Sequence, residues 1–146
     1  TQFHDLILMV ARALARLPVI PAPAGSRFQP VDAADVAGRM AELALGEPSG
    51  LVPDLAGPKI YTVPELVNSY LRAAGKRRPL VPVHLPGQAA RALRAGANLA
   101  PDRAVGTVPF ERYLEGQLAA GTRPYGDAVR SYSGSRVTNR PGDDTA

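Results

Sequence analysis

The stretch from Arg27 to Met40 joins the signals of a β-strand directly to those of an α-helix. Phe28 and Val31 favour a strand that ends at this point. Asp32 follows and can accept a hydrogen bond from the amide of Asp35, as a helix N-cap does. A strand that leads straight into a capped helix is half of an α/β unit. This stretch therefore predicts an α/β fold.

The same combination occurs again later in the chain. Residues 59–61 favour a short strand, and Thr62 and Glu65 match a capping box, in which each side chain bonds the other residue's backbone amide. The helix that follows is expected to end at Gly75. Apolar residues at three- and four-residue steps predict further helices, and apolar extended runs predict further strands. The expected helices are 1–17, 87–98 and 109–118, the last capped by Thr107, and the expected strands are 51–53 and 80–83.

These elements amount to four to five helices and a few short strands. The strands are too few and too scattered for a self-contained parallel sheet, so we expect an incomplete sheet that forms the lobe of something larger. Residues 1–121 are expected to form this lobe. Residues 122–146 are rich in Ser, Gly, Arg and Asp without apolar periodicity, and are predicted to be a disordered tail.

Composition excludes several classes of function. The net charge of +4 comes mainly from arginines that are spread along the chain, and aromatic residues make up 5%, so no nucleic-acid partner is expected. The absence of cysteine removes disulfides and thiolate chemistry. No apolar run approaches the roughly 20 residues needed to cross a bilayer. Arg12 and Arg16 follow the apolar run near the N-terminus, whereas a signal peptide carries its positive charge before such a run. We expect a cytoplasmic protein with no membrane partner.

No catalytic constellation is visible in the residues themselves. The chain contains no G-x-G-x-x-G or phosphate loop, no Tyr-x-x-x-Lys pair and no G-x-S-x-G elbow. His4 and His84 are far apart in sequence, and neither belongs to a metal-ligand motif, so no metal site is expected. His4 is interpreted as polar surface or the wall of a cleft, and His84 as a loop residue.

Three segments resemble a known family. They are TQFHDLILMV, RFQPVDAADVAGRMAELAL and GPKIYTVPELVNSYLRAAGKRRPLVPVHLPG. They are similar to the C-terminal half of an atypical short-chain dehydrogenase/reductase of the NmrA-like, NAD(P)-binding type, and the resemblance covers residues 1–118. It implies the C-terminal portion of a Rossmann-like extended short-chain dehydrogenase/reductase fold. In that family an N-terminal Rossmann portion carries the glycine-rich cofactor loop, which is not in this chain.

The resemblance also implies a place for a substrate cleft. Residues that match the start of this chain would lie near the nicotinamide end of NAD(P) and a small-molecule substrate, and the start of the second segment would line the same cleft. The candidate cleft residues are Thr1, Gln2, Phe3, His4, Arg27 and Phe28. No catalytic, cofactor-binding or metal-binding residue is assigned.

Three interpretations remain open. The chain is part of an NAD(P)-dependent oxidoreductase-like protein and is inactive alone, or it belongs to a non-catalytic dinucleotide-sensing regulator. The third alternative is a protein-interaction domain that uses the apolar faces of the helices at 3–17 and 109–118.

Overall fold

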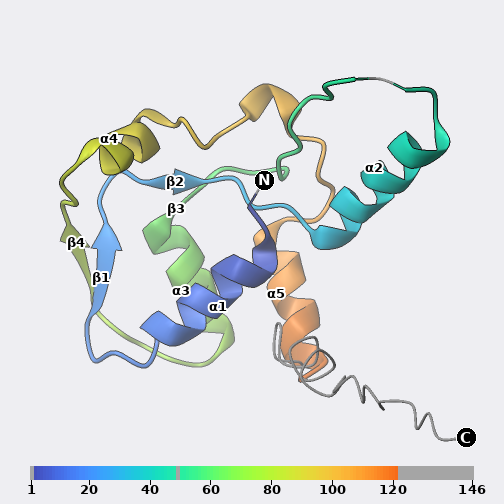
Figure 1. The fold of residues 1–146 in the computed structure, drawn as a ribbon. Coiled ribbons are helices and arrows are strands. Elements are labelled where there is room, and N and C mark those ends of the chain that lie inside the picture. The colour runs from blue at the N-terminus through green and yellow to red at the C-terminus, as the bar shows by residue number, and fades with distance from the viewer. Residues whose placement is uncertain (1, 49, 122–146) are drawn as a thin grey trace, which may run out of the picture.

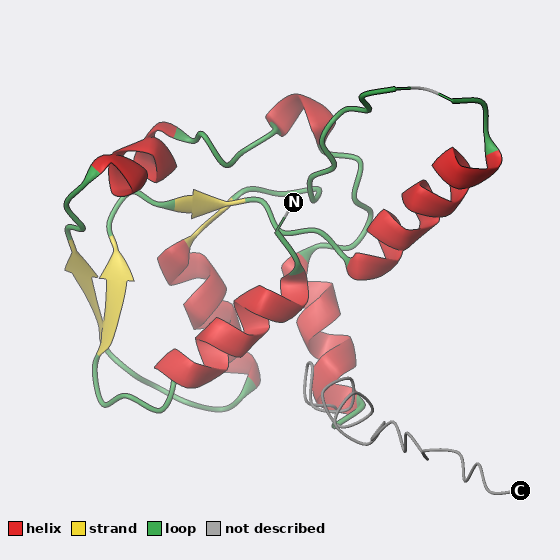
Figure 2. Ribbon diagram, in the orientation of Figure 1, coloured by secondary structure: helices red, strands yellow, loops and turns green. Residues whose placement is uncertain are grey.

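The computed structural model describes residues 2–48 and 50–121, and the tail expected at 122–146 lies outside them. Within these ranges the chain forms five α-helices, one short 3-10 helix and four short strands (Figures 1 and 2). In chain order they are α1 (His4–Leu14), β1 (Ile20–Pro23), β2 (Arg27–Phe28), α2 (Ala33–Leu45), β3 (Tyr61–Thr62), α3 (Val63–Ala73), β4 (Leu80–Val83), α4 (Gln88–Ala95), η1 (Pro101–Arg103) and α5 (Phe110–Ala119). The expected α/β class is confirmed, although the strand expected at 51–53 does not form.

The strands are arranged in two separate pairs. β1 and β4 are parallel, with Ile20 opposite Leu80 and Pro23 opposite Val83. β2 and β3 are antiparallel and contribute two residues each. The sheet is therefore as incomplete as the sequence predicts, and most of the buried surface has to come from the helices.

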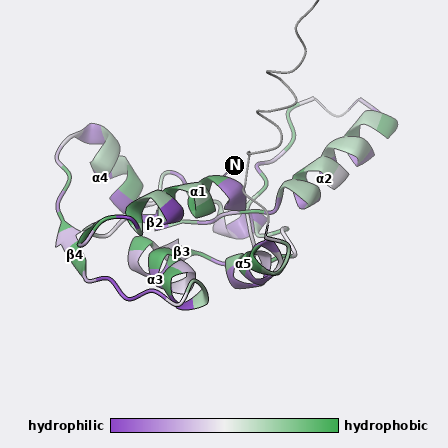
Figure 3. Cartoon of the chain, turned by 90° about the horizontal axis from the view of Figure 1, so that it is seen from below, coloured by the Kyte–Doolittle hydropathy of each residue, from purple (hydrophilic) through white to green (hydrophobic). Residues whose placement is uncertain are grey.

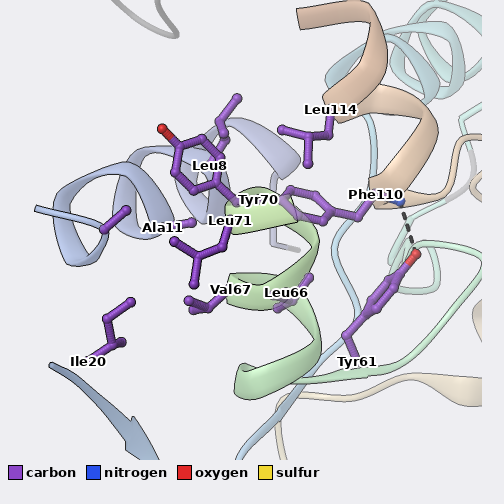
Figure 4. Close-up of a cluster of buried hydrophobic side chains, with 11 residues drawn as sticks. Leu8, Ala11, Ile20, Tyr61, Leu66, Val67, Tyr70, Leu71, Phe110 and Leu114 are labelled. Atoms are coloured by element: carbon purple, nitrogen blue, oxygen red, sulfur yellow. Dashed lines mark hydrogen bonds between the residues drawn. The ribbon is translucent and has the colours of Figure 1, made fainter. Parts of the chain in front are cut away.

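The core lies where α1, α3 and α5 meet (Figure 4). Leu8 on α1 and Phe110 on α5 are fully buried, and α3 contributes the largest number of buried side chains. Each such side chain stabilises the fold by roughly 1.5–3 kcal/mol through its removal from water. The buried cluster consists of Leu8, Ala11, Ala15, Ile20, Tyr61, Leu66, Val67, Tyr70, Leu71, Phe110 and Leu114.

Tyr61 fixes the start of α5 against this core. Its hydroxyl donates to the Glu111 carboxylate at 2.6 Å and accepts a hydrogen bond from the Phe110 amide at 3.0 Å. Lys59 donates to the other carboxylate oxygen of Glu111 at 3.0 Å. Burial, together with the carboxylate beside it, holds the pKa of Tyr61 well above its ordinary value. The Tyr61 hydroxyl therefore keeps its proton, and its two hydrogen bonds join β3 to α5.

The predicted helix caps are confirmed at α3, confirmed with a different bonded amide at α2, and wrong at α5. The Thr62–Glu65 capping box is present as predicted. Asp32 caps α2, but it accepts from the amide of Ala34 at 2.7 Å rather than from that of Asp35. Thr107 does not cap α5, because it lies two residues before the N-cap position; its amide and hydroxyl both donate to the Asp35 carboxylate at 2.8 Å. The N-cap position of α5 is Pro109, which has no side-chain acceptor to offer.

Helix α2 differs from the other α-helices in the described part of the chain because it contributes no buried residue. Figure 1 shows it at the right of the molecule, away from the α1–α3–α5 core. The apolar residue Met40 is 65% exposed, and Leu45 at the end of the helix is 91% exposed.

Candidate functional site

A parallel backbone pairing joins the start of the described chain to the segment before α2. The amide of Val31 donates to the carbonyl of Gln2 at 2.7 Å, and the amide of His4 donates to the carbonyl of Val31 at 3.1 Å. Phe3 and Val31 thereby form an isolated parallel bridge. Both extended segments turn into helices directly afterwards. In α/β folds, ligands bind beyond the carboxyl ends of parallel strands, so the surroundings of this bridge are the first place to look for a site.

Two glutamine side chains form a hydrogen-bonded frame beside the bridge. The Gln2 side chain accepts from the amide of Gln29 at 3.0 Å and donates to the carbonyl of Asn98 at 3.1 Å. The Gln29 side chain donates to the carbonyl of Gly57 at 2.9 Å and accepts from the amide of Ala100 at 3.0 Å. We call Gln2, Gln29 and Asn98 the amide frame. It ties together segments that are up to 96 residues apart.

Asn98 completes the frame and leaves one acceptor without a partner. Its side-chain nitrogen donates to the carbonyl of Arg27 at 2.8 Å. Its Oδ1 atom is buried and has no hydrogen-bond partner. Buried polar atoms are nearly always satisfied in folded proteins. The frame is therefore a polar region with unused hydrogen-bonding capacity.

A small polar cavity lies against the amide frame. Its volume is about 160 Å³, close to the roughly 150 Å³ that holds a single benzene ring in an engineered protein cavity. Asp54 is the one ionisable residue among those that line it. The cavity can therefore hold a small neutral group by hydrogen bonds, but it offers little acid–base chemistry. The lining residues are Gln2, Gln29, Asp54, Leu55, Ala56, Ala97, Asn98, Leu99 and Ala100.

Gly57 permits the close backbone approach behind this cavity. A Cβ atom on Gly57 would lie 1.7 Å from the carbonyl oxygen of Pro30, far inside van der Waals contact. The amide of Gly57 also donates to the carbonyl of Gln29 at 3.4 Å. A side chain at this position would force the two segments apart and open the amide frame.

His4 lies in the core and does not line the polar cavity. Its side chain is fully buried, and Nε2 is 2.8 Å from the carbonyl oxygen of Val108, which assigns the ring proton to Nε2. The opposite nitrogen, Nδ1, is buried without a partner. The ring stacks on Tyr113 with centroids 5.0 Å apart. Burial lowers the pKa of His4 below its ordinary value, so the ring is a neutral structural group.

A partly buried proton donor beside His4, the hydroxyl of Tyr113, is also engaged. The Tyr113 hydroxyl donates to the Asp5 carboxylate at 2.6 Å. Burial, and then the hydrogen bond to Asp5, holds the pKa of Tyr113 well above its ordinary value. Neither Tyr113 nor His4 is arranged to exchange a proton with a molecule in the polar cavity.

Phe28 lines a different, apolar cavity of about 400 Å³ between α1, β1 and α3. Residues of this cavity include Leu6, Leu14, Pro21 and Val63. A third cavity of about 520 Å³ lies beside α2. The apolar cavity provides no hydrogen-bonding side chain, so it can accept aliphatic or aromatic groups without orienting them.

The candidate cleft residues are thus only partly brought together. Gln2 lines the polar cavity, Phe3 forms the parallel bridge, and the Arg27 carbonyl reaches Asn98. His4 lies in the core, Phe28 lines the apolar cavity, and Thr1 lies outside the described residues. The assignment of these residues to one substrate cleft remains a prediction.

Sequence reasoning missed two residues of the amide frame. Gln29 stands inside the segment that carries the family resemblance, and a buried amide next to a predicted strand could have been noticed there. Asn98 gave no signal, because its partner Arg27 is 71 residues away in the sequence.

Metal ligation and membrane crossing find no support in the described residues. Among positions 2–48 and 50–121, no three His, Asp or Glu side chains gather in a way that could hold a metal ion. No helix in these ranges is both long enough and apolar enough to span a bilayer.

Comparison with known proteins gives a fold likeness alone. No protein-family model matches the chain, and no curated protein matches it. Its structure is similar to the crystal structure of a new type of NADPH-dependent quinone oxidoreductase (QOR2) from Escherichia coli, with a TM-score of 0.60 and 17% identity over 80% of this chain. The QOR2 structure complexed with NADPH gives a TM-score of 0.60 and 18% identity over 80% of this chain.

The likeness is confined to part of the oxidoreductase. The chain spans about half the length of these structures, 52% of the first and 51% of the second. The five helices and small parallel pairings of the described residues therefore match a partial Rossmann-like α/β domain.

Proposed function

We propose that this chain is the C-terminal, substrate-side portion of an NAD(P)-dependent oxidoreductase. We further propose that an N-terminal Rossmann portion of the same protein supplies the glycine-rich cofactor loop. The observation that carries the proposal is the fold likeness to about half of an NADPH-dependent quinone oxidoreductase. The lack of any G-x-G-x-x-G in this chain is consistent with it, because the pyrophosphate of a dinucleotide needs close backbone amides.

The amide frame is the part of this chain best suited to the reacting end of the site. It stands beside the Phe3–Val31 parallel bridge, lines the polar cavity of about 160 Å³ and holds the buried Oδ1 atom of Asn98 without a partner. Gln2 and Asn98 offer hydrogen bonds to a small neutral substrate, and Gln29 is buried and holds the frame together. When bound, NAD(P)H supplies the hydride, and the role of the frame is to orient the acceptor.

Turnover and binding by the complete protein test this proposal. The isolated chain should show no micromolar binding of NADPH in calorimetry, whereas the protein with its N-terminal portion should bind NADPH and oxidise it with a panel of quinones and carbonyl compounds. Micromolar NADPH binding by the isolated chain would contradict the proposal, because the cofactor site would then be within these residues.

Substitution of Gln2 tests the role of the frame. In the complete protein, Gln2→Ala removes the hydrogen bonds to Gln29 and Asn98, and misorientation of the acceptor should lower kcat/KM by up to about a hundredfold. The matched control is Gln88→Ala at the exposed start of α4, which should leave kcat/KM unchanged. Equal kcat/KM for the two variants, with equal melting temperatures, would remove the frame from the substrate site.

A second candidate function is a non-catalytic dinucleotide-sensing regulator. It is favoured by the state of the proton donors, since His4, Tyr61 and Tyr113 are all committed to structural hydrogen bonds. A complete protein that binds NADPH tightly but oxidises it with none of the tested acceptors would support this candidate over the enzyme.

A further inference from the structure

Acidic residues are unevenly distributed along the chain. Two segments, 6–31 and 66–101, contain no acidic residue, and together they form most of α1 and α3 and all of β1, β2, β4 and α4. We call these two segments the basic lobe. The side chains of Lys59 and Arg39, which form ion pairs with Glu111 and Glu42, lie outside it. The basic residues of the lobe are Arg12, Arg16, Arg27, Arg72, Lys76, Arg77, Arg78, Arg91 and Arg94.

The parallel pairing of β1 and β4 brings two loops of this lobe to one edge. Because the strands run in the same direction, the loops that precede them, 15–19 and 74–79, lie beside each other at the same end. The amide of Ile20 donates to the carbonyl of Pro79 at 2.9 Å and joins the two loops. Figure 1 shows both loops along the bottom of the molecule, and Figure 3, which views the molecule from below, shows the connection from α3 to β4 as a hydrophilic stretch.

This edge combines cations with exposed aliphatic side chains. Arg16, Lys76, Arg77 and Arg78 are all exposed. Leu17 and Val19 stand in the adjoining loop with 40% and 45% of their surface in contact with solvent. We call residues 16–19 and 76–79 the basic edge.

Stabilisation of the helices explains only part of this charge. Arg12 and Arg72 occupy the last turns of α1 and α3, where a cation is favoured by the helix dipole. Arg77 and Arg78 lie beyond the end of α3 at Ala73, outside the turn over which that effect acts. The helix dipole therefore does not account for these two arginines.

We propose that the basic edge docks this protein on the surface of an anionic lipid bilayer. Juxtaposed arginines and lysines are attracted to anionic headgroups, and aliphatic loop residues can bury in the headgroup region. This proposal departs from the sequence-based expectation of no membrane partner, which rested on the lack of a spanning segment. Docking of this kind needs a surface alone. The inference is independent of the proposed oxidoreductase function.

Single-stranded nucleic acid fits this edge less well than a lipid surface. Binding of single strands uses exposed aromatic side chains on which bases stack. The aromatic residues of the basic lobe are Phe28 and Tyr70, which are partly buried and buried, respectively. The groups that the edge presents beside its cations are aliphatic, and these suit acyl chains.

Vesicle sedimentation tests the proposal with the chain itself. The chain should sediment with vesicles of phosphatidylcholine and phosphatidylglycerol in equal parts, should not sediment with pure phosphatidylcholine, and should dissociate as salt is raised. Arg77→Gln/Arg78→Gln should lower the partition coefficient roughly thirtyfold, since each basic residue near the surface contributes about 1 kcal/mol. Leu17→Ser should also lower the partition coefficient. This loss should be several-fold larger at high salt than at low salt, because the apolar contact then supplies most of the remaining binding.

The matched control removes the same charge elsewhere. Arg91→Gln/Arg112→Gln changes exposed residues on α4 and α5, and should leave most of the binding intact. Three results would overturn the proposal. The first is no binding to anionic vesicles at low salt, and the second is an equal loss of binding in the two double variants. The third is binding that both double variants retain, because the contact would then lie elsewhere, residues 122–146 included. Full displacement of the chain from the vesicles by duplex DNA, with no effect of Leu17→Ser on vesicle binding, would assign the edge to nucleic acid. This result would also overturn the proposal.

Discussion

Helices α2 and α3 begin in the same way and end up in different environments. Each follows a short extended segment, and each starts with a capping side chain, Asp32 for α2 and Thr62 for α3. Yet α3 buries five residues, whereas α2 buries none. Similar local signals have thus produced one helix in the centre of the core and one at its margin.

The difference shows that helix formation and helix burial have separate causes. A cap acts on backbone groups within one turn and needs no distant partner. Burial needs apolar surfaces from elsewhere, and α3 receives them from α1 and α5. Helix α2 has a polar tie instead, through the two hydrogen bonds from Thr107 to Asp35.

Paired leucine substitutions should give the largest contrast between the two helices. Leu71→Ala on α3 removes a side chain that is 3% exposed, and the resulting cavity should lower the free energy of unfolding by about 2–5 kcal/mol. Leu45→Ala on α2 removes the same atoms from a side chain that is 91% exposed, and should change it by less than about 0.5 kcal/mol. Urea denaturation followed by circular dichroism measures both.

Each variant serves as the control for the other, because the chemical change is identical. Comparable losses in Leu71→Ala and Leu45→Ala would mean that α2 is packed against something in solution, and the contrast drawn above would fail.

Local features of the fold were accessible from the sequence because they depend on neighbouring residues. The Thr62–Glu65 box, the β4 strand and the α/β class were all predicted correctly. The Thr107 cap was wrong, because α5 begins at Phe110 with Pro109 in the N-cap position. Thr107 instead donates twice to the Asp35 carboxylate, 72 residues away, a contact that the sequence does not reveal.

The candidate site follows the same rule. Gln2 could be named from the family resemblance, and it does line the polar cavity. Asn98 could not, because its role is set by a hydrogen bond to the carbonyl of Arg27, 71 residues away. Gln29 lies inside a segment that carries the resemblance and was overlooked there. His4 reads as a polar residue in the sequence, but the carbonyl of Val108 and the ring of Tyr113 accommodate it in the core.

Acid should weaken the packed core through His4. Burial lowers its pKa from the ordinary 6.5, so below pH 6.5 the unfolded chain binds a proton that the folded chain does not. The free energy of unfolding should therefore fall as pH falls below this value, by up to roughly 1.4 kcal/mol per pH unit. Denaturation at a series of pH values measures the slope.

The His4 contribution is identified by two substitutions. His4→Gln should flatten the slope just below pH 6.5, whatever its effect on stability itself. His84→Gln changes an exposed residue after β4, and should leave the slope as it is. A slope that survives His4→Gln would show that some other group carries the proton linkage.

Removal of the two caps should give the smallest effect and the sharpest comparison. Thr62→Ala and Asp32→Ala each delete a side-chain acceptor, from the amides of Glu65 and Ala34 respectively, at an intrinsic cost of about 1 kcal/mol to the helix. Because α3 is part of the core, loss of its cap should appear in full in global unfolding. Loss of the α2 cap should instead raise amide exchange in the first turn of α2 and leave the urea midpoint nearly unchanged, since a helix without buried residues can fray while the core stays folded. A lowered midpoint in both variants would mean that α2 and the core unfold as one unit, and that the hydrogen bonds from Thr107 to Asp35 couple them more strongly than the burial pattern indicates.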